Sequence, residues 1–177
     1  VDDLPIYRWK SPLQRCVQIL KRHRDVMYKD NPDGKPISII ITTLAAAAYQ
    51  GETEIDAALE RILSTMGSLV NPRKPRVPNP VNPAEDFADK WGDAKYSHLY
   101  LEDNFKLWLE RAKADFHILA NTRDAELLVE HAQDRYGIAL GREGLAERLG
   151  LGAPSVSATP KTHTIIETPA RPWCRLK

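Results

Sequence analysis

The chain has 177 residues, 42% of them hydrophobic and 28% charged, which is the composition of a single globular domain with an apolar core. It contains no apolar run long enough for a membrane-spanning helix and no segment that resembles a signal peptide, so we expect a cytoplasmic protein without a membrane partner. Cys16 and Cys174 lie far apart, with no second Cys or His at metal spacing, which argues against a zinc site and a disulfide framework.

Positive charge is concentrated near the N-terminus, although the net charge of the whole chain is only +1. Residues 8–35 hold eight Lys and Arg against three acidic residues, whereas residues 84–147 are rich in Glu and Asp. This asymmetry indicates that the N-terminal part faces an anion such as phosphate. A solvated basic face explains the same charges equally well.

The first predicted helix runs from Ser11 to about Tyr28. Ser11 and Gln14 have the spacing of a capping box, and Pro12 suits the first helical position. Apolar residues recur at helical spacing on one face of this segment: Leu13, Cys16, Val17, Leu20 and Met27. Arg24 points into the same apolar arc, so we expect it to have an acidic partner, because a buried unpaired charge is costly.

Two further helices are predicted before a proline-rich segment. After an Asn-Pro-Asp-Gly turn at 31–34, residues 37–48 are apolar on almost every side and end in four alanines, which favours a buried helix over a strand. Gly51 ends that segment. An amphipathic helix is then expected from Glu52 to about Val70.

The next segment is expected to be extended. Residues 71–83 contain five prolines and cannot form a helix. The sequence Asn-Pro-Ala-Glu at 82–85 then predicts a second capping box, which opens a short helix that carries Phe87 and Trp91.

Three more helices complete the prediction of an all-α fold. A long helix is expected near 99–119, a second begins with Thr122 as its cap and ends at Gly137, and a short one reaches about Leu149. We therefore predict a helical domain over residues 1–150. Residues 151–177 are rich in Pro, Ser and Thr and are expected to form a tail, with one extended stretch near 162–167.

The usual patterns of catalytic and metal-binding residues are missing from the sequence. It contains no Gly-x-x-x-x-Gly-Lys phosphate loop, no Gly-x-Ser-x-Gly elbow, no His pair at metal spacing and no Asp-x-Asp pair. Glu52 and Glu54 lie on a predicted helix, where residues two apart point to different sides and cannot chelate one metal together. We therefore assign no catalytic residue and no metal ligand to this chain. Its residues alone indicate a binding or scaffold domain.

Three segments follow one another in a recognisable order. They are SPLQRCVQILKRHRD at 11–25, KPISIIITTLA at 35–45 and VPNPVNPAEDF at 77–87. The first two resemble the C-terminal helical domain of the CD-NTase family, the bacterial relatives of cyclic GMP-AMP synthase. The third is similar to a segment of oligoadenylate synthetases and their bacterial relatives. The resemblance implies a helical bundle like the second domain of poly(A) polymerases and oligoadenylate synthetases, with extended Pro-rich segments.

The resemblance implies that Lys21 and Ser38 bind a nucleoside triphosphate. In the family, a lysine on the first helix and a serine that opens the next helix bind the triphosphate, and these two residues occupy the matching positions. Their chemistry agrees, because an ammonium group and a helix N-terminus both favour an anion. The alternative is a solvated surface lysine and a serine that only caps a helix. Gln14 and Gln18 share the side of Lys21 and are candidates for contact with a base or ribose.

The catalytic half of the family is not found in this sequence. Family enzymes carry a Gly-Ser motif and three metal-binding acids in an N-terminal domain, whereas Gly67-Ser68 ends a predicted helix here and no Asp-x-Asp follows it. Because the chain also begins with Val1, we interpret it as part of a longer protein and expect it to be inactive alone.

The resemblance further implies what the parent protein does. It would join ATP and other nucleoside triphosphates into a cyclic di- or trinucleotide second messenger, with magnesium bound in the missing catalytic domain. That domain would be the partner of this chain across the substrate cleft. A separate regulatory or effector protein is expected to respond to the product in antiphage defence.

Two alternatives remain open at this point. One is a non-enzymatic helical interaction module whose basic N-terminal face binds a protein or a nucleic acid. The other is a different template-independent polymerase, similar to an oligoadenylate synthetase. The upstream coding sequence distinguishes the classes, because a Gly-Ser motif followed by Asp-x-Asp would support an enzyme and a start codon at Val1 would support the module.

Overall fold

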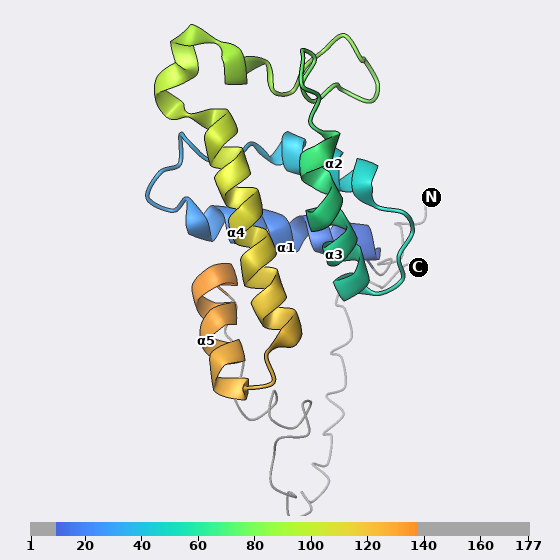
Figure 1. Ribbon diagram of the computed structural model, residues 1–177, viewed down its shortest axis with the longest axis vertical. Coiled ribbons are helices and arrows are strands. Elements are labelled where there is room, and N and C mark those ends of the chain that lie inside the picture. Colours follow the sequence, from blue (N-terminus) through green and yellow to red (C-terminus); the bar gives the residue numbers. More distant parts are fainter. Residues whose placement is uncertain (1–9, 138–177) are drawn as a thin grey trace, which may run out of the picture.

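The computed structural model of the chain describes residues 10–137, and its regular elements are all helical (Figure 1). Within this range no strand occurs, and the pairing of Pro78 with Asp86 is an isolated antiparallel bridge. The predicted all-α fold is therefore confirmed. The elements in chain order are α1 (Pro12–Met27), α2 (Ser38–Ala48), α3 (Ile55–Thr65), η1 (Met66–Leu69), η2 (Asp89–Gly92), η3 (Ala94–Leu99), α4 (Leu101–Asn121) and α5 (Ala125–Tyr136).

Helix α1 is the central element, because it contacts each of the other four α-helices. In Figure 1 it crosses α3 and α4, while α5 lies alongside the C-terminal half of α4. No helix in residues 10–137 combines the length and the apolarity that crossing a membrane requires. The helix expected up to Leu149, the tail at 151–177 and the extended stretch near 162–167 lie outside the described residues.

The predicted start of α1 is confirmed. The Gln14 backbone N–H donates to Ser11 Oγ at 3.3 Å, and the Ser11 N–H donates to Gln14 Oε1 at 3.0 Å, which together form the capping box. The helix buries Cys16, Leu20, His23 and Arg24 against its neighbours. Burial raises the pKa of the Cys16 thiol to about 11, so this cysteine behaves as a small apolar residue.

The buried helix predicted over 37–48 is confirmed as α2. It packs with Ile40, Ile41, Leu44, Ala45 and Ala48 inside, while its opposite face carries the exposed Ile39. The turn that precedes it is held by α4, because Asn104 Nδ2 donates to the Gly34 carbonyl at 2.9 Å. The Tyr28 hydroxyl in turn donates to the Asn104 carbonyl at 2.9 Å. These bonds fix where α2 begins.

The third helix is shorter than predicted. Helix α3 begins at Ile55 instead of Glu52, because Gly51 has a positive φ of 96° and the Glu52 carboxylate accepts from the Gln50 N–H at 3.0 Å. The Glu52 side chain is thus folded back onto the turn that precedes α3. The C-terminal part of the predicted helix is the 3-10 helix η1.

The predicted capping box at 82–85 is wrong. The Glu85 carboxylate accepts from Asn79 Nδ2 at 2.6 Å, and the Glu85 N–H donates to the Asn82 carbonyl at 2.9 Å, which makes a turn. The neighbouring Asp86 holds both sides of this loop, since its carboxylate accepts from the N–H groups of Arg76, Val77 and Ala88 at 2.8–2.9 Å. A short helix begins only later, at η2.

The cap of the last helix is also corrected. Asp124 caps α5, because its carboxylate accepts from the N–H groups of Glu126 and Leu127 at 2.9 and 3.4 Å. Thr122 instead ends α4. The predicted end at Gly137 is confirmed by its left-handed φ of 60°.

Replacing Asp86 tests the loop that leads to η2. Burial opposes ionisation of Asp86, but the three backbone N–H donors outweigh it and lower the pKa of its carboxyl. Asp86→Ala leaves these donors without their acceptor and is expected to lower the free energy of unfolding by about 2 kcal/mol. Denaturant titration measures it.

The exposed Asp89, three residues further on, provides the matched control, and Asp89→Ala is expected to change stability little. Because the pKa of Asp86 is depressed in the folded chain, its contribution is present above the unfolded value of about 3.9 and is lost as the pH falls through the folded value. Equal stability of the two variants at pH 7 would contradict this account.

Candidate functional site

The C-terminal end of α1 carries five consecutive polar residues, 21–25, which reach different parts of the molecule. They diverge because each residue of an α-helix is rotated by about 100° from the previous one. Arg22 points to the end of α5, where its Nε donates to the Tyr136 carbonyl at 2.9 Å. His23 and Arg24 are buried, toward α4 and α2 respectively. One helix end thus connects three neighbouring helices.

Lys21 lies in a surface depression between α1 and α2 with a volume of about 380 Å³. Among the described residues, no ion pair of its ammonium group is found. The predicted sharing of one side by Gln14, Gln18 and Lys21 is confirmed, since all three line this depression. Its complete lining is Lys10, Leu13, Gln14, Val17, Gln18, Lys21, Thr42 and Ala46. The depression therefore combines two lysines and two glutamines with apolar side chains.

Ser38 is the first residue of α2, as predicted, and it is exposed. The preceding Ile37 is the N-cap, so Ser38 is not the cap that the alternative interpretation required. Ile37 offers no side-chain cap, and no acidic residue occupies the first turn of α2. The N-terminal N–H groups of this helix are thus left without a side-chain acceptor at the protein surface.

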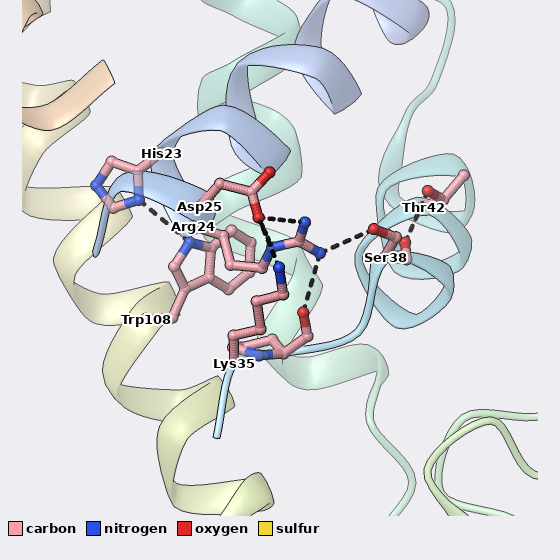
Figure 2. A network of polar contacts seen from close by, with 8 residues as sticks. His23, Arg24, Asp25, Lys35, Ser38, Thr42 and Trp108 are labelled. Atoms are coloured by element: carbon pink, nitrogen blue, oxygen red, sulfur yellow. Dashed lines mark hydrogen bonds and ion pairs between the residues drawn. The ribbon is translucent and has the colours of Figure 1, made fainter. Parts of the chain in front are cut away.

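Arg24 joins the end of α1 to the start of α2, as Figure 2 shows. Its Nη1 donates to Ser38 Oγ at 2.9 Å and to the Pro36 carbonyl at 3.0 Å. Its Nε and Nη2 donate to Asp25 Oδ1 at 3.1 and 2.7 Å. The expectation of an acidic partner for this buried arginine is therefore confirmed, and the partner is the next residue in the chain.

Asp25 is shared between two cations. Lys35 Nζ lies 3.3 Å from the same Oδ1 that accepts from Arg24. Burial opposes ionisation of Asp25, but the hydrogen bonds and charges of Arg24 and Lys35 outweigh it and lower the pKa of the carboxyl. Two cations against one carboxylate leave a net positive charge beside the start of α2.

The two predicted site residues border the same face of the molecule but do not touch through a hydrogen bond in the described structure. Thr42 links them: it lines the depression that holds Lys21, and its hydroxyl donates to the Ser38 carbonyl at 2.8 Å. Ser38 itself does not line that depression and contacts Arg24 instead. Whether the two side chains bind one ligand stays a prediction.

An apolar depression of about 700 Å³ adjoins the basic one on the other side of α2. Thr42 and Ala46 line both. The remaining walls come from α2 and from the proline-rich loop, including Ile39, Pro80 and Phe87. The exposed face of α2 therefore separates an apolar depression from one that also holds two lysines, and this suits a ligand that has a charged and a flat apolar part.

His23 is a structural residue of this helix end. Trp108 Nε1 donates to His23 Nδ1 at 3.1 Å, and His23 Nε2 lies 3.1 Å from Asp115 Oδ2. Because an indole N–H can only donate, Nδ1 must be unprotonated, and the proton is on Nε2. Burial accordingly lowers the pKa of His23, against the opposing influence of Asp115.

Sequence reasoning missed two residues of the candidate site, Thr42 and Lys10. Both follow from the pairing of α1 with α2, which no pattern within either segment reveals. The bond from Arg24 to Ser38 was also missed, although the arginine in an apolar arc was a signal that a buried partner existed. Among residues 10–137, no group of three or more His, Cys, Asp and Glu is arranged to hold a metal ion.

These features define an all-α domain with an anion-attracting helix start and a lysine on the same face. A sequence relative is the c-di-GMP synthase of Roseivirga ehrenbergii, 39% identical over 116 residues, which are 61% of this chain and 31% of the relative. The chain thus spans less than a third of that protein. No protein-family model matches the chain.

A solved structure with a similar fold is the CD-NTase CdnG of Bradyrhizobium diazoefficiens in complex with GTP. The similarity has a TM-score of 0.55 with 19% identity, over 81% of this chain and 40% of the other. The two comparisons agree with the resemblance stated from the sequence, and the solved structure shows that the helical fold is similar to part of a CD-NTase. That family includes nucleotidyltransferases that synthesise cyclic dinucleotides.

Removing the indole donor tests the protonation state of His23. In Trp108→Phe, no N–H faces Nδ1, so the pKa of His23 is expected to rise relative to the unchanged protein. An NMR titration of the His23 ring measures it. Trp91→Phe is the control, because Trp91 stacks on Phe105 and has no bond to His23.

The unchanged protein should lose stability in mild acid. Because the folded chain resists protonation of His23, the unfolded chain binds that proton more readily below pH about 6.5, and the free energy of unfolding falls as the pH decreases from there. A pKa of His23 that is the same in both tryptophan variants and the unchanged protein would contradict the proposed tautomer.

Proposed function

We propose that this chain is the C-terminal helical part of a nucleotidyltransferase that makes a cyclic dinucleotide second messenger, and that it grips the triphosphate of a bound nucleotide. Lys21 supplies a point charge for the phosphates, and Ser38 supplies a hydroxyl at the start of α2. The catalytic residues belong to an N-terminal domain outside this chain, and the product acts on a separate effector in antiphage defence.

The observation that carries this proposal is the surface between α1 and α2. Lys21 and Thr42 line one depression there, and Thr42 is bonded to Ser38 one helical turn away. A triphosphate spanning that turn would meet an ammonium group and a hydroxyl together. Charge-assisted hydrogen bonds of this kind are worth about 1.5–3 kcal/mol each.

The start of α2 supports the same proposal. It lacks a side-chain cap and an acidic residue in its first turn, so the positive end of the helix dipole is not neutralised from within. The Arg24–Asp25–Lys35 group adds a net positive charge beside it. A relative named as a c-di-GMP synthase and a structural neighbour bound to GTP are consistent with a guanine nucleotide.

Magnesium does not fit the described residues. In the part of the chain that the structure describes, no group of three or more His, Cys, Asp and Glu is arranged to hold a metal ion. Of the acids near the start of α2, Asp25 pairs with two cations and Asp86 accepts from three backbone N–H groups. In this proposal the metal expected from the family resemblance is therefore bound by residues outside this chain.

Binding of GTP to the full-length protein that contains this chain tests the proposed grip. Lys21→Ala and Ser38→Ala are each expected to weaken binding about tenfold or more, because each removes one charge-assisted contact with phosphate. Isothermal titration calorimetry with GTP and with ATP measures the dissociation constants. Thermal unfolding should be little changed in Lys21→Ala. Ser38→Ala removes one of the acceptors of the buried Arg24, so its thermal unfolding is measured beside its affinity.

Two matched substitutions control for generic effects. Lys29→Ala removes an exposed lysine from the same basic segment, and Ser64→Ala removes an exposed serine from α3. Both should bind GTP like the unchanged protein. Unchanged affinity in Lys21→Ala and Ser38→Ala would overturn the proposal and favour the interaction module.

The chain by itself should form no product. Incubated with ATP, GTP and magnesium, a pure preparation of residues 1–177 is expected to yield no cyclic dinucleotide by chromatography and mass spectrometry. The full-length protein is the positive control. Product from the isolated chain would show that catalytic groups exist within it.

A further inference from the structure

The hydroxyl of Ser38 cannot donate a hydrogen bond to Arg24, its partner in the structure. Its Oγ accepts from Arg24 Nη1 at 2.9 Å, and a guanidinium group carries donors only. The hydroxyl hydrogen therefore points away from Arg24. In the described structure, no hydrogen bond is donated by Ser38 Oγ, although the residue is exposed. The arginine thus presents Ser38 as a hydrogen-bond donor to whatever binds at the start of α2.

We propose that Arg24 is a positioning residue that fixes the Ser38 hydroxyl as a donor to a phosphate oxygen of the bound nucleotide, and that Asp25 holds Arg24 in that orientation. This inference rests on the proposed function, because it needs a triphosphate at Ser38. Arg24 itself does not touch the nucleotide. Its side chain is only 5% exposed.

The geometry restrains the guanidinium on every edge. Nη1 spans Ser38 Oγ and the Pro36 carbonyl, while Nε and Nη2 both donate to one oxygen of Asp25. Since the guanidinium is planar, holding one edge fixes the direction of the other. Figure 2 shows Arg24 lying between Asp25 on one side and Ser38 on the other. The position of Ser38 is therefore set from α1.

The same restraint relates Ser38 to Lys21. Lys21 and Arg24 are three residues apart on α1, and such residues are neighbours on a helix surface. The arginine fixes the first residue of α2 at this point, while the lysine reaches the depression beside Thr42. The bond from Arg24 to Ser38 thus holds the start of α2 next to the turn of α1 that carries Lys21.

Replacing Asp25 distinguishes the positioning role from a simple effect of charge, because the two predict opposite changes in the affinity for GTP. If charge alone mattered, removing a carboxylate near the phosphates would strengthen the binding of an anion. If Asp25 orients Arg24, its removal weakens binding, since the guanidinium then rotates and Ser38 loses its fixed direction. Asp25→Ala removes an acceptor of the buried Arg24 and is expected to cost some stability, but the Asp25 side chain is 43% exposed, so water can reach the vacated position. Thermal unfolding shows whether the variant is folded at the temperature of the binding measurement.

The first experiment compares Asp25→Ala with Asp30→Ala in the full-length protein, with GTP as the ligand. Asp30 is exposed and lies in the same basic segment, so its replacement makes the same change in charge without touching Arg24. Asp25→Ala is expected to weaken GTP binding about fivefold, on the scale of one hydrogen bond. Asp30→Ala should bind equally well or slightly more tightly. Tighter binding in Asp25→Ala would overturn the inference.

The second experiment is a double-mutant cycle between Arg24→Gln and Ser38→Ala. If Arg24 acts through Ser38, Arg24→Gln weakens GTP binding about tenfold when Ser38 is present. In the Ser38→Ala background, the same substitution weakens binding about twofold or less. Arg24→Lys should recover part of the affinity at most, because an ammonium group cannot keep both edges engaged. Effects that multiply in full would mean that the arginine acts independently of Ser38, and the inference would be wrong.

Arg22→Gln is the control for loss of a guanidinium from this helix end. Arg22 donates to the carbonyls of Tyr136 and Gly137, away from α2. Its replacement should leave the GTP dissociation constant unchanged and should show no coupling to Ser38→Ala. Coupling of equal size in both cycles would reveal a general structural effect and overturn the specific role of Arg24.

The outcomes distinguish the two proposals. In one outcome, Lys21→Ala and Ser38→Ala weaken GTP binding, Asp25→Ala strengthens it, and Arg24→Gln shows no coupling to Ser38→Ala. The proposed binding of the triphosphate is then supported, and the positioning role of Arg24 is wrong. If Ser38→Ala has no effect on GTP binding, both fail. Should Arg24→Gln not fold, the comparison of Asp25→Ala with Asp30→Ala still decides, because those two residues are exposed.

Discussion

The contact between Arg24 and the start of α2 is the interaction on which the candidate site depends. A guanidinium buried in this way would be strongly destabilising without acceptors on all its edges, and it has them in Asp25, the Pro36 carbonyl and Ser38. A buried ion pair of this kind is weak evidence for stability but restricts geometry closely. It therefore explains why a charged residue lies where the helix pattern calls for an apolar one.

The end of α1 binds several neighbours at once because α1 contacts each of the other four α-helices of the described range. His23 binds α4, Arg22 binds the end of α5 and Arg24 binds the start of α2, whereas Lys21 lines the depression beside α2. Most residues of the segment 21–25 therefore hold neighbouring helices in place. They support the surface on which Lys21 lies.

Two depressions adjoin on the exposed side of α2. The depression that holds Lys21 and the apolar depression share Thr42 and Ala46. The small side chains of these two residues leave the surface of α2 open between the depressions. A nucleotide has the matching division into a charged phosphate chain and a flat base. The chain spans 31% of the c-di-GMP synthase that it resembles.

The sequence by itself determined the α-helices of the described range to within a few residues, because helical periodicity, prolines and caps act locally. It also predicted that Lys21 and Ser38 bind a nucleoside triphosphate, because two segments resemble the CD-NTase family. Local rules failed at 82–85, where the Asn79 amide binds the Glu85 carboxylate, and at Thr122, where Asp124 caps the next helix instead. Only the tertiary structure decided that Arg24 meets Ser38 and that Thr42 borders the depression of Lys21. These contacts join residues of two helices, and no pattern within one helix specifies how the two pack.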